Sequence, residues 1–219
     1  AYSGSHNINH IINTSGIVEL RIIGGGPELA RGWVDELSII EVYSGPVWHV
    51  STDGSDDNDG SEESPFATIQ AGIDASSDGD TVLVWDGTYS GEGNIEIDFL
   101  NKPINVFSLN GPENCIIDCQ NAGRGFVFQS GENENSVLSG FTIMNGSRED
   151  DNYPYGSGGG ILCTDYSSPT LHNLIVSNCY AYNNGGGISC AENSNPILNN
   201  INIIDNNTPS NGGGLFISS

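Results

Sequence analysis

Basic residues are scarce in this chain. Five Lys and Arg stand against 28 Asp and Glu among 219 residues, which gives a formal net charge of −23 at pH 7. Proteins that bind nucleic acid neutralise phosphates with clustered Lys and Arg, and anionic membrane surfaces attract the same residues. The sequence therefore predicts neither a nucleic-acid-binding protein nor one that binds anionic membranes.

Long apolar runs are absent as well. No stretch of the sequence reaches the ~18–20 apolar residues of a membrane-spanning helix, so no transmembrane segment is expected. The N-terminus lacks the pattern of a signal peptide, and Ala1 also fits the first residue left after the removal of one. With 36% hydrophobic residues the chain is too apolar for a disordered acidic tail, and we expect a folded domain.

Cysteine occurs in an odd number, without the paired C-x-x-C pattern of a zinc site and without the spacing of a small disulfide framework. The five positions are Cys115, Cys119, Cys163, Cys179 and Cys190. On one strand Cys115 and Cys119 would lie ~13 Å apart, which is too far for a disulfide. The sequence therefore predicts buried thiols, and it leaves open whether Cys163 and Cys190 are thiols or a disulfide.

Glycine is abundant, with 30 residues, and much of it belongs to an internal repeat. The segments 158–163, 185–190 and 212–217 each begin with three glycines, and both steps are 27 residues long (185 − 158 and 212 − 185). A weaker copy lies upstream at 125–145, and an insertion at 148–155 separates it from the next copy. Repeats of this length indicate a stacked architecture.

Each repeat contains short runs of alternating apolar and polar residues and lacks helical periodicity. Strands that pair with the strands of the next coil form a β-solenoid, with ~4.8 Å between coils. We expect Asn residues to form ladders at the bends, and an interior that includes Ile161, Cys163, Leu174 and Val176. The alternative is an antiparallel sandwich, which three copies in register disfavour.

One helix is predicted, over residues 64–73. Ser64 would be its N-cap and Pro65 its first helical residue, and Phe66, Ile69 and Ile73 share one face. A stack of strands needs a cover over its open end, because unpaired strand edges invite association with other chains. We expect this helix to cover the N-terminal end of the solenoid.

Four segments near the start of the predicted solenoid form a series, at 50–60 (Val-Ser-Thr-Asp-Gly-Ser-Asp-Asp-Asn-Asp-Gly), 64–70, 79–82 and 86–89. Together they resemble the first part of right-handed parallel β-helix proteins of the pectin-lyase-like superfamily, in particular secreted bacterial ones. The Gly-Gly-Gly-Ile units also resemble the repeats of chlamydial polymorphic outer-membrane proteins. The resemblance covers about residues 48–219 and implies an all-β, right-handed parallel β-helix in a secreted or cell-surface bacterial protein. It implies no single activity, since the superfamily includes pectate lyases, polygalacturonases and adhesins.

Two parts are predicted, a β-rich N-terminal segment (1–46) and a parallel β-helix domain (47–219). Residues 18–22 and 34–43 alternate as strands do, but two or three strands do not form an independently stable sheet. Residues 32–37 weakly resemble the last strand of jelly-roll carbohydrate-binding modules. The segment is interpreted as part of such a module, as packing along the β-helix, or as an arm that donates strands to a neighbour.

The sequence shows no catalytic constellation. A lyase of this superfamily would need Ca²⁺ held by carboxylates and a Lys or Arg that removes the proton next to a uronate carboxyl group. The basic residues of the solenoid are Lys102, Arg124 and Arg148, and we expect each to be a solvated charge. Asp118 and Asp205 stand alone on their strands, whereas a hydrolase needs paired carboxylates. No residue is assigned a catalytic role, and an enzyme is the less favoured interpretation.

An acidic loop is the candidate metal site. Its carboxylates, with glycines for tight turns, would wrap a Ca²⁺ ion, and the residues assigned to it are Asp53, Asp56, Asp57 and Asp59. The loop lacks the EF-hand spacing, and the alternative is a solvated loop without a metal.

The insertion is the candidate carbohydrate site. Insertions on a solenoid often map to the binding face, and aromatic side chains flanked by carboxylates suit neutral sugars. The residues assigned to this site are Glu149, Asp151, Tyr153 and Tyr155. The alternative is a loop with no ligand.

We therefore expect a non-catalytic extracellular or cell-surface module with a structural or adhesive role. The last repeat ends at Ser219 without a cap, which predicts head-to-tail self-association into fibres, and a cell-surface or glycan partner is the other expectation. The alternatives are a polysaccharide lyase or glycoside hydrolase, and a carbohydrate- or Ca²⁺-binding module of such an enzyme.

Overall fold

A computed structural model of the chain describes residues 19–23, 36–40 and 45–218. The contacts between Cα atoms divide the chain into one unit at Ala1–Ser44 and another at Gly45–Ser219. In the first unit β1 (Glu19–Ile23) and β2 (Glu36–Ile40) pair antiparallel, with Leu20 opposite Ile39. The resemblance to a jelly-roll strand at 32–37 falls mostly outside the described residues.

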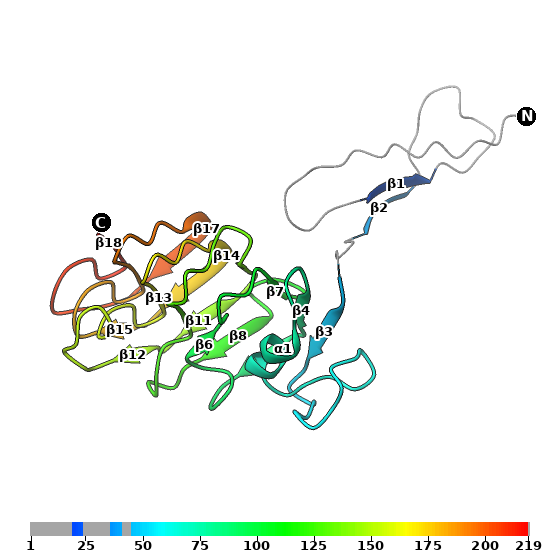
Figure 1. The fold of residues 1–219 in the computed structure, drawn as a ribbon, viewed down its shortest axis with the longest axis horizontal. Helices are drawn as coiled ribbons and strands as arrows, with labels where there is room; N and C mark the ends of the chain where they lie inside the picture. Colours follow the sequence, from blue (N-terminus) through cyan, green and yellow to red (C-terminus); the bar gives the residue numbers. More distant parts are fainter. Residues whose placement is uncertain (1–18, 24–35, 41–44, 219) are drawn as a thin grey trace, which may run out of the picture. The chain divides into compact units, whose positions relative to one another are not determined.

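The second unit is a parallel β-helix, as the repeat predicts (Figure 1). Two sheets run along it. The nine-stranded sheet has the order β3-β4-β7-β10-β14-β11-β8-β5, with β17 beside β14, and the five-stranded sheet has the order β18-β16-β13-β9-β6. The ladders between these strands are parallel.

The strands of the nine-stranded sheet are β3 (Val47–Val50), β4 (Thr81–Val84), β5 (Gly87–Tyr89), β7 (Asn105–Ser108), β8 (Cys115–Asp118), β10 (Val137–Ser139), β11 (Thr142–Met144), β14 (Thr170–Ser177) and β17 (Ile197–Ile204). Those of the five-stranded sheet are β6 (Ile97–Asp98), β9 (Phe126–Phe128), β13 (Ile161–Cys163), β16 (Ile188–Cys190) and β18 (Leu215–Ile217). A further parallel pair consists of β12 (Ser147–Arg148) and β15 (Tyr180–Ala181).

One repeat of the sequence is one coil of the fold. Ile161 pairs with Ile188, and Ile188 pairs with Leu215, which are steps of 27 residues (188 − 161 and 215 − 188). The side chains expected inside are at most 1% exposed, and they are Ile161, Cys163, Leu174 and Val176. The core predicted from the alternation of apolar residues is confirmed.

Asparagines occupy bends of the coils, as expected. Asn173 and Asn200 have φ angles of 50° and 54°, a left-handed conformation that Asn tolerates better than most residues. The side-chain amide of Asn200 donates to Oδ1 of Asn173 on the preceding coil, at 2.8 Å. The predicted ladder is present at this bend.

The helix begins later than predicted. α1 spans Ile69–Ala75, and its N-cap is Thr68, whose side chain accepts a hydrogen bond from the N–H of Ala71. Ser64 and Pro65 precede the helix, because the backbone of Phe66 bonds to the β3 region, donating to the carbonyl of His49 and accepting from the N–H of Ser51. These contacts hold Phe66 beside a strand and exclude it from the helical turn.

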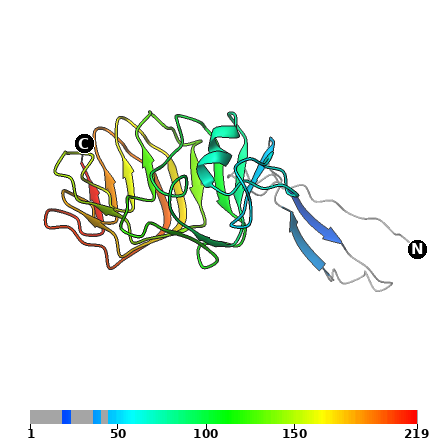
Figure 2. The same cartoon turned by 90° about the horizontal axis from the view of Figure 1, so that it is seen from below.

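α1 lies at the end of the β-helix where β3 is, opposite the coil that holds β18 (Figure 2). Ile69 and Ile73 are fully buried, and a Cβ atom at Gly72 would meet the side chains of Val82 and Val50. The amide of Gln70 accepts from the backbone N–H of Asp98 at 3.0 Å and donates to its carbonyl at 3.1 Å. α1 therefore covers the core at this end, and Gln70 takes the place of a neighbouring strand for β6.

All five cysteines are buried free thiols. Burial raises the pKa of the Cys179 thiol to about 11. Among the described residues no helix is long and apolar enough to cross a membrane.

Candidate functional site

Lys102 caps the C-terminal end of α1. Its Nζ atom donates to the carbonyls of Ile73, Asp74 and Ser76, at 2.7, 3.0 and 2.9 Å. These carbonyls lie at the C-terminal end of α1, where a positive charge is favourable. The prediction of a solvated charge is wrong for Lys102, because the side chain reaches back about one coil to the helix.

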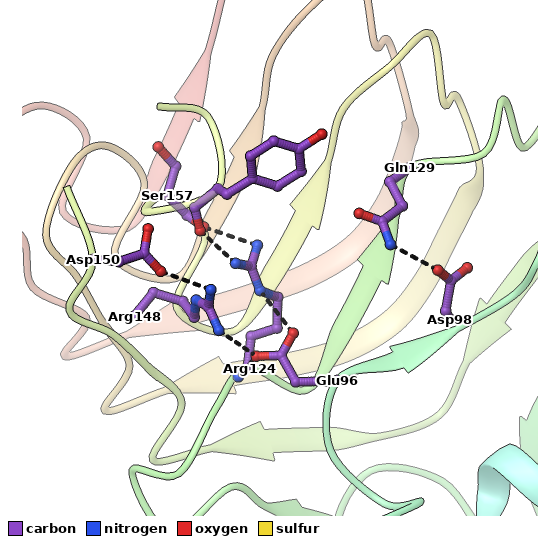
Figure 3. Close-up of polar contacts among 8 residues, drawn as sticks. Glu96, Asp98, Arg124, Gln129, Arg148, Asp150 and Ser157 are labelled. Carbon is purple, nitrogen blue, oxygen red and sulfur yellow. Dashed lines mark hydrogen bonds and ion pairs between the residues drawn. The ribbon is translucent and has the colours of Figure 1, made fainter. Parts of the chain in front are cut away.

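Arg124 is buried, with 2% of its side chain exposed. Its Nε atom lies 3.3 Å from Oε2 of Glu96, and its terminal nitrogens donate to the carbonyls of Ser157 at 3.1 Å and Tyr155 at 2.5 Å (Figure 3). Arg124 precedes β9, whereas Tyr155 belongs to the insertion and Ser157 follows it. The prediction of a solvated charge is wrong here too, since this guanidinium holds the insertion to the coil before it.

Arg148 extends the same network. Its guanidinium bonds to Oε1 of Glu96 at 3.1 Å and to Oδ2 of Asp150 at 2.7 Å (Figure 3). With 29% of the side chain exposed, Arg148 is also not a freely solvated charge. We call Glu96, Arg124, Arg148 and Asp150 the arginine network.

Burial shifts the titration of Arg124. Desolvation lowers its pKa to about 10, while the neighbouring Glu96 carboxylate favours the charged form and Arg148 disfavours it. Arg124 therefore stays protonated at neutral pH. A buried charge is stable only when it is paired and hydrogen-bonded, and Glu96 with the two carbonyls provides this.

The insertion lies against the wall of the β-helix. Val127, Leu162 and Ser189 alternate with core residues on β9, β13 and β16, so they point outward, yet they are 6%, 0% and 0% exposed. The hydroxyl of Tyr155 donates to Oδ2 of Asp165, just after β13, at 3.3 Å. The hydroxyl of Tyr153 is 3.1 Å from Oγ of Ser218, just after β18. We infer that the loop packs on the outer face of the five-stranded sheet rather than projecting from it.

The residues assigned to a carbohydrate site are only partly together. Tyr153 and Tyr155 are 50% and 43% exposed, and Glu149 and Asp151 are exposed. The carboxylate beside Tyr155 is Asp165, from another coil, and it raises the pKa of Tyr155 more than burial does. Asp150, which was not assigned, belongs to the arginine network.

Three residues near Tyr155 were not assigned to a site from the sequence, and they are Asp165, Tyr166 and Glu192. Tyr166 is 71% exposed next to Asp165, and Glu192 bonds through Oε2 to the hydroxyl of Thr164 at 3.0 Å. The sequence held a signal for Tyr166, since the repeat places it at the position of Asn193 (193 − 166 = 27). It held none for Asp165, whose contact with Tyr155 depends on how the insertion folds.

Two carboxylates of the acidic loop accept hydrogen bonds from backbone N–H groups. Asp56 accepts hydrogen bonds from the N–H groups of Ala67 and Thr68, at 2.9 Å each, and from the Thr68 hydroxyl. Asp59 accepts from the N–H of Ser61 at 3.0 Å. Asp53 and Asp57 are exposed. Among the described residues no group of three or more His, Cys, Asp or Glu is placed to hold a metal ion, and the Ca²⁺ site stays a prediction.

Comparisons with known proteins place this fold in a family. A family model described as "Pel9A-like, right handed beta helix region" matches residues 48–215. The uncharacterized protein YwoF of Bacillus subtilis (strain 168) is 30% identical over 115 residues, 52% of this chain. The match covers 20% of that relative, so the chain spans about one fifth of its length. A solved rhamnogalacturonan lyase aligns with 80% of this chain and 63% of its own, at 15% identity and a TM-score of 0.38.

Proposed function

Since the chain belongs to the Pel9A-like right-handed β-helix family, we propose that it is a non-catalytic structural and adhesive module of a secreted or cell-surface bacterial protein. The observation that carries the proposal is the use of the basic side chains of the β-helix. Lys102, Arg124 and Arg148 all bond to the backbone or the carboxylates of the fold itself.

A lyase needs a base that reaches the proton beside a uronate carboxyl group. Arg124 is 2% exposed and aims at two carbonyls of the insertion, and the ammonium group of Lys102 is shared by three carbonyls of α1. Release of either group would break contacts that hold an element of the fold. These side chains are better explained as structural groups than as bases.

A location outside the cell is supported by the Gly-Gly-Gly-Ile units, which resemble repeats of chlamydial surface proteins. Retention of bacteria on beads that carry the chain tests adhesion. Beads with the chain should retain more cells than beads with an unrelated acidic protein, and equal retention would overturn the adhesive role.

Self-association is part of the proposal. Strand pairing between neighbouring molecules would join them head to tail. Light scattering should show a mass that rises with concentration, and a monomer at every concentration would contradict this.

A carbohydrate-active enzyme is the competing function. Its support is the fold, which the superfamily's lyases and hydrolases share. Release of unsaturated or reducing ends from a polysaccharide would favour it and would overturn the non-catalytic proposal.

A further inference from the structure

Three tyrosines gather beside the five-stranded sheet, and we call Tyr153, Tyr155 and Tyr166 the tyrosine face. They are 50%, 43% and 71% exposed. Tyr153 and Tyr155 come from the insertion, and the hydroxyl of Tyr155 bonds to Asp165, the neighbour of Tyr166. The face therefore joins two segments, and it includes Tyr166, which no sequence pattern assigned to a site.

Tyr166 has an unfavourable backbone for its side chain. In the part of the chain that the structure describes, four pairs of consecutive residues other than glycine have left-handed φ angles, and they are Leu100–Asn101, Gln120–Asn121, Asp165–Tyr166 and Glu192–Asn193. The second residue is Asn in three of them, and Asn adopts this conformation readily. Tyr166, at φ 63°, is a bulky residue that the conformation disfavours. At 71% exposure its ring gains little burial in return, so the fold itself gives no reason for this tyrosine.

The tyrosine face has two levels along the stack of coils. The hydroxyl of Tyr155 is held after β13 and that of Tyr153 after β18, with β16 between these strands. Two steps of ~4.8 Å place the two levels about 10 Å apart. A ligand that contacts both needs apolar surfaces repeated along its length.

The charged groups on this surface are carboxylates. Asp165 accepts from the hydroxyl of Tyr155 and Glu192 from that of Thr164, and a carboxylate accepts hydrogen bonds only. The ligand must therefore supply donors, and the net charge of −23 disfavours an anionic one. An uncharged glycan has both features, because its sugar rings present apolar C–H faces at regular intervals and hydroxyl donors at their edges.

We infer that the tyrosine face binds an uncharged glycan that runs along the stack of coils. The inference rests on the proposed function, since it names the ligand of a non-catalytic adhesive module. The arginine network holds the face in place, because Arg124 bonds to the carbonyl of Tyr155 itself.

Calorimetry with the full chain tests the inference. The probes are soluble β-glucan, galactomannan and arabinoxylan, with polygalacturonate as the anionic probe and oligolysine as the cationic one. At least one neutral polysaccharide should bind, and the anionic and cationic probes should bind more weakly.

The decisive variant is Tyr166→Asn, which installs the residue found in the other left-handed pairs. It should lower the association constant about three- to tenfold, the effect of one lost aromatic contact, while its thermal midpoint stays the same or rises. Tyr155→Ala should weaken binding by a similar factor. The matched control is Tyr182→Asn, since Tyr182 is 47% exposed and is bonded through its N–H to the carbonyl of Arg148.

Each outcome is informative. Absence of binding to every neutral polysaccharide, or unchanged affinity in Tyr166→Asn, would overturn the inference. Tighter binding of polygalacturonate or oligolysine would overturn the ligand class. Binding together with cleavage of the polysaccharide would support the tyrosine face as a binding site and would overturn the non-catalytic proposal.

Discussion

Residues 158–218 and residues 96–157 stack their coils in different ways. In the first region contacts between coils join residues 27 positions apart, such as Asn173 with Asn200 and Ser167 with Ser194. In the second region Arg124 reaches Glu96, 28 positions before it, and Ser157, 33 positions after it. The regular region needs only its repeat, whereas the irregular one needs a buried charge that anchors an insertion. The difference indicates that the repeat supplies the scaffold, and the proposed tyrosine face lies where the insertion meets it.

The largest expected effect is the loss of the anchor. Arg124→Ala leaves the carbonyls of Tyr155 and Ser157 and one side of Glu96 without their partner. A hydrogen bond to a charged group contributes about 1.5–3 kcal/mol, so the loss of the two bonds to carbonyls should lower the free energy of unfolding by about 3–5 kcal/mol, which urea denaturation measures. Arg148→Ala, at a more exposed position, is the control and should have a clearly smaller effect. Equal losses of free energy of unfolding in the two variants would contradict the anchoring role of Arg124.

Substitution of a glycine should destabilise the regular region (158–218). A Cβ atom at Gly186 would overlap the carbonyl oxygens of Asn207 and Gly213, so Gly186→Ala forces the coils apart and should lower the free energy of unfolding by about 3 kcal/mol. Gly131→Ala is the control, because its φ is 80° but nothing lies within 4 Å of the added atom. The control should lose only about 1 kcal/mol. A smaller loss for Gly186 than for Gly131 would contradict the close approach of the coils.

The contact between α1 and the five-stranded sheet should have an intermediate effect. Gln70→Met keeps the length of the side chain but removes the amide that bonds to the backbone of Asp98. The loss of these bonds should lower the free energy of unfolding by about 1–2 kcal/mol. A Met variant as stable as the wild type would show that solvent satisfies the edge of β6 equally well.

The smallest effect concerns the acidic loop. Hydrogen bonds from the side chain and the backbone N–H of Ser61 lower the pKa of Asp59 below its usual 3.8. This contribution to stability is therefore present above pH 3.8 and is lost as the pH falls through the pKa of the folded state. The Ser61→Ala variant should raise the pKa of Asp59 in an NMR titration, and an unchanged pKa would contradict the assignment.

Binding of Ca²⁺ by the same loop can be tested through the thermal midpoint. The Asp56 carboxylate already accepts three hydrogen bonds from the segment that leads into α1. If the loop binds Ca²⁺ at the predicted site of Asp53, Asp56, Asp57 and Asp59, the ion should raise the thermal midpoint, because a ligand of the folded state stabilises it. The Asp57→Asn variant should lose that rise, and a midpoint that Ca²⁺ does not change would overturn the predicted site.

The sequence predicted the scaffold because each coil repeats the same alternation. Ile161 and Ile188, 27 residues later, are both fully buried, so one pattern describes both strands. The helix began later than predicted because Phe66 bonds to the β3 region, a contact that local preferences do not show. Such a contact forms only when the surrounding coil has folded, so the local sequence does not predict it.

The side-chain network could not be predicted in the same way. Nothing beside Lys102 or Arg124 in the sequence shows the carbonyls that they bind, which lie 26–33 positions away. Charged residues are usually solvated, so that expectation was reasonable and wrong. The repeat could have drawn attention to Tyr166, because it aligns this residue with Asn193.

The central claim is that the basic side chains of the β-helix serve the fold and not a reaction. The most direct test is the absorbance of unsaturated ends during incubation of the chain with polygalacturonate and Ca²⁺. We predict no rise above the level without protein. A rise that disappears in a folded Arg124→Lys or Lys102→Met variant would contradict the claim.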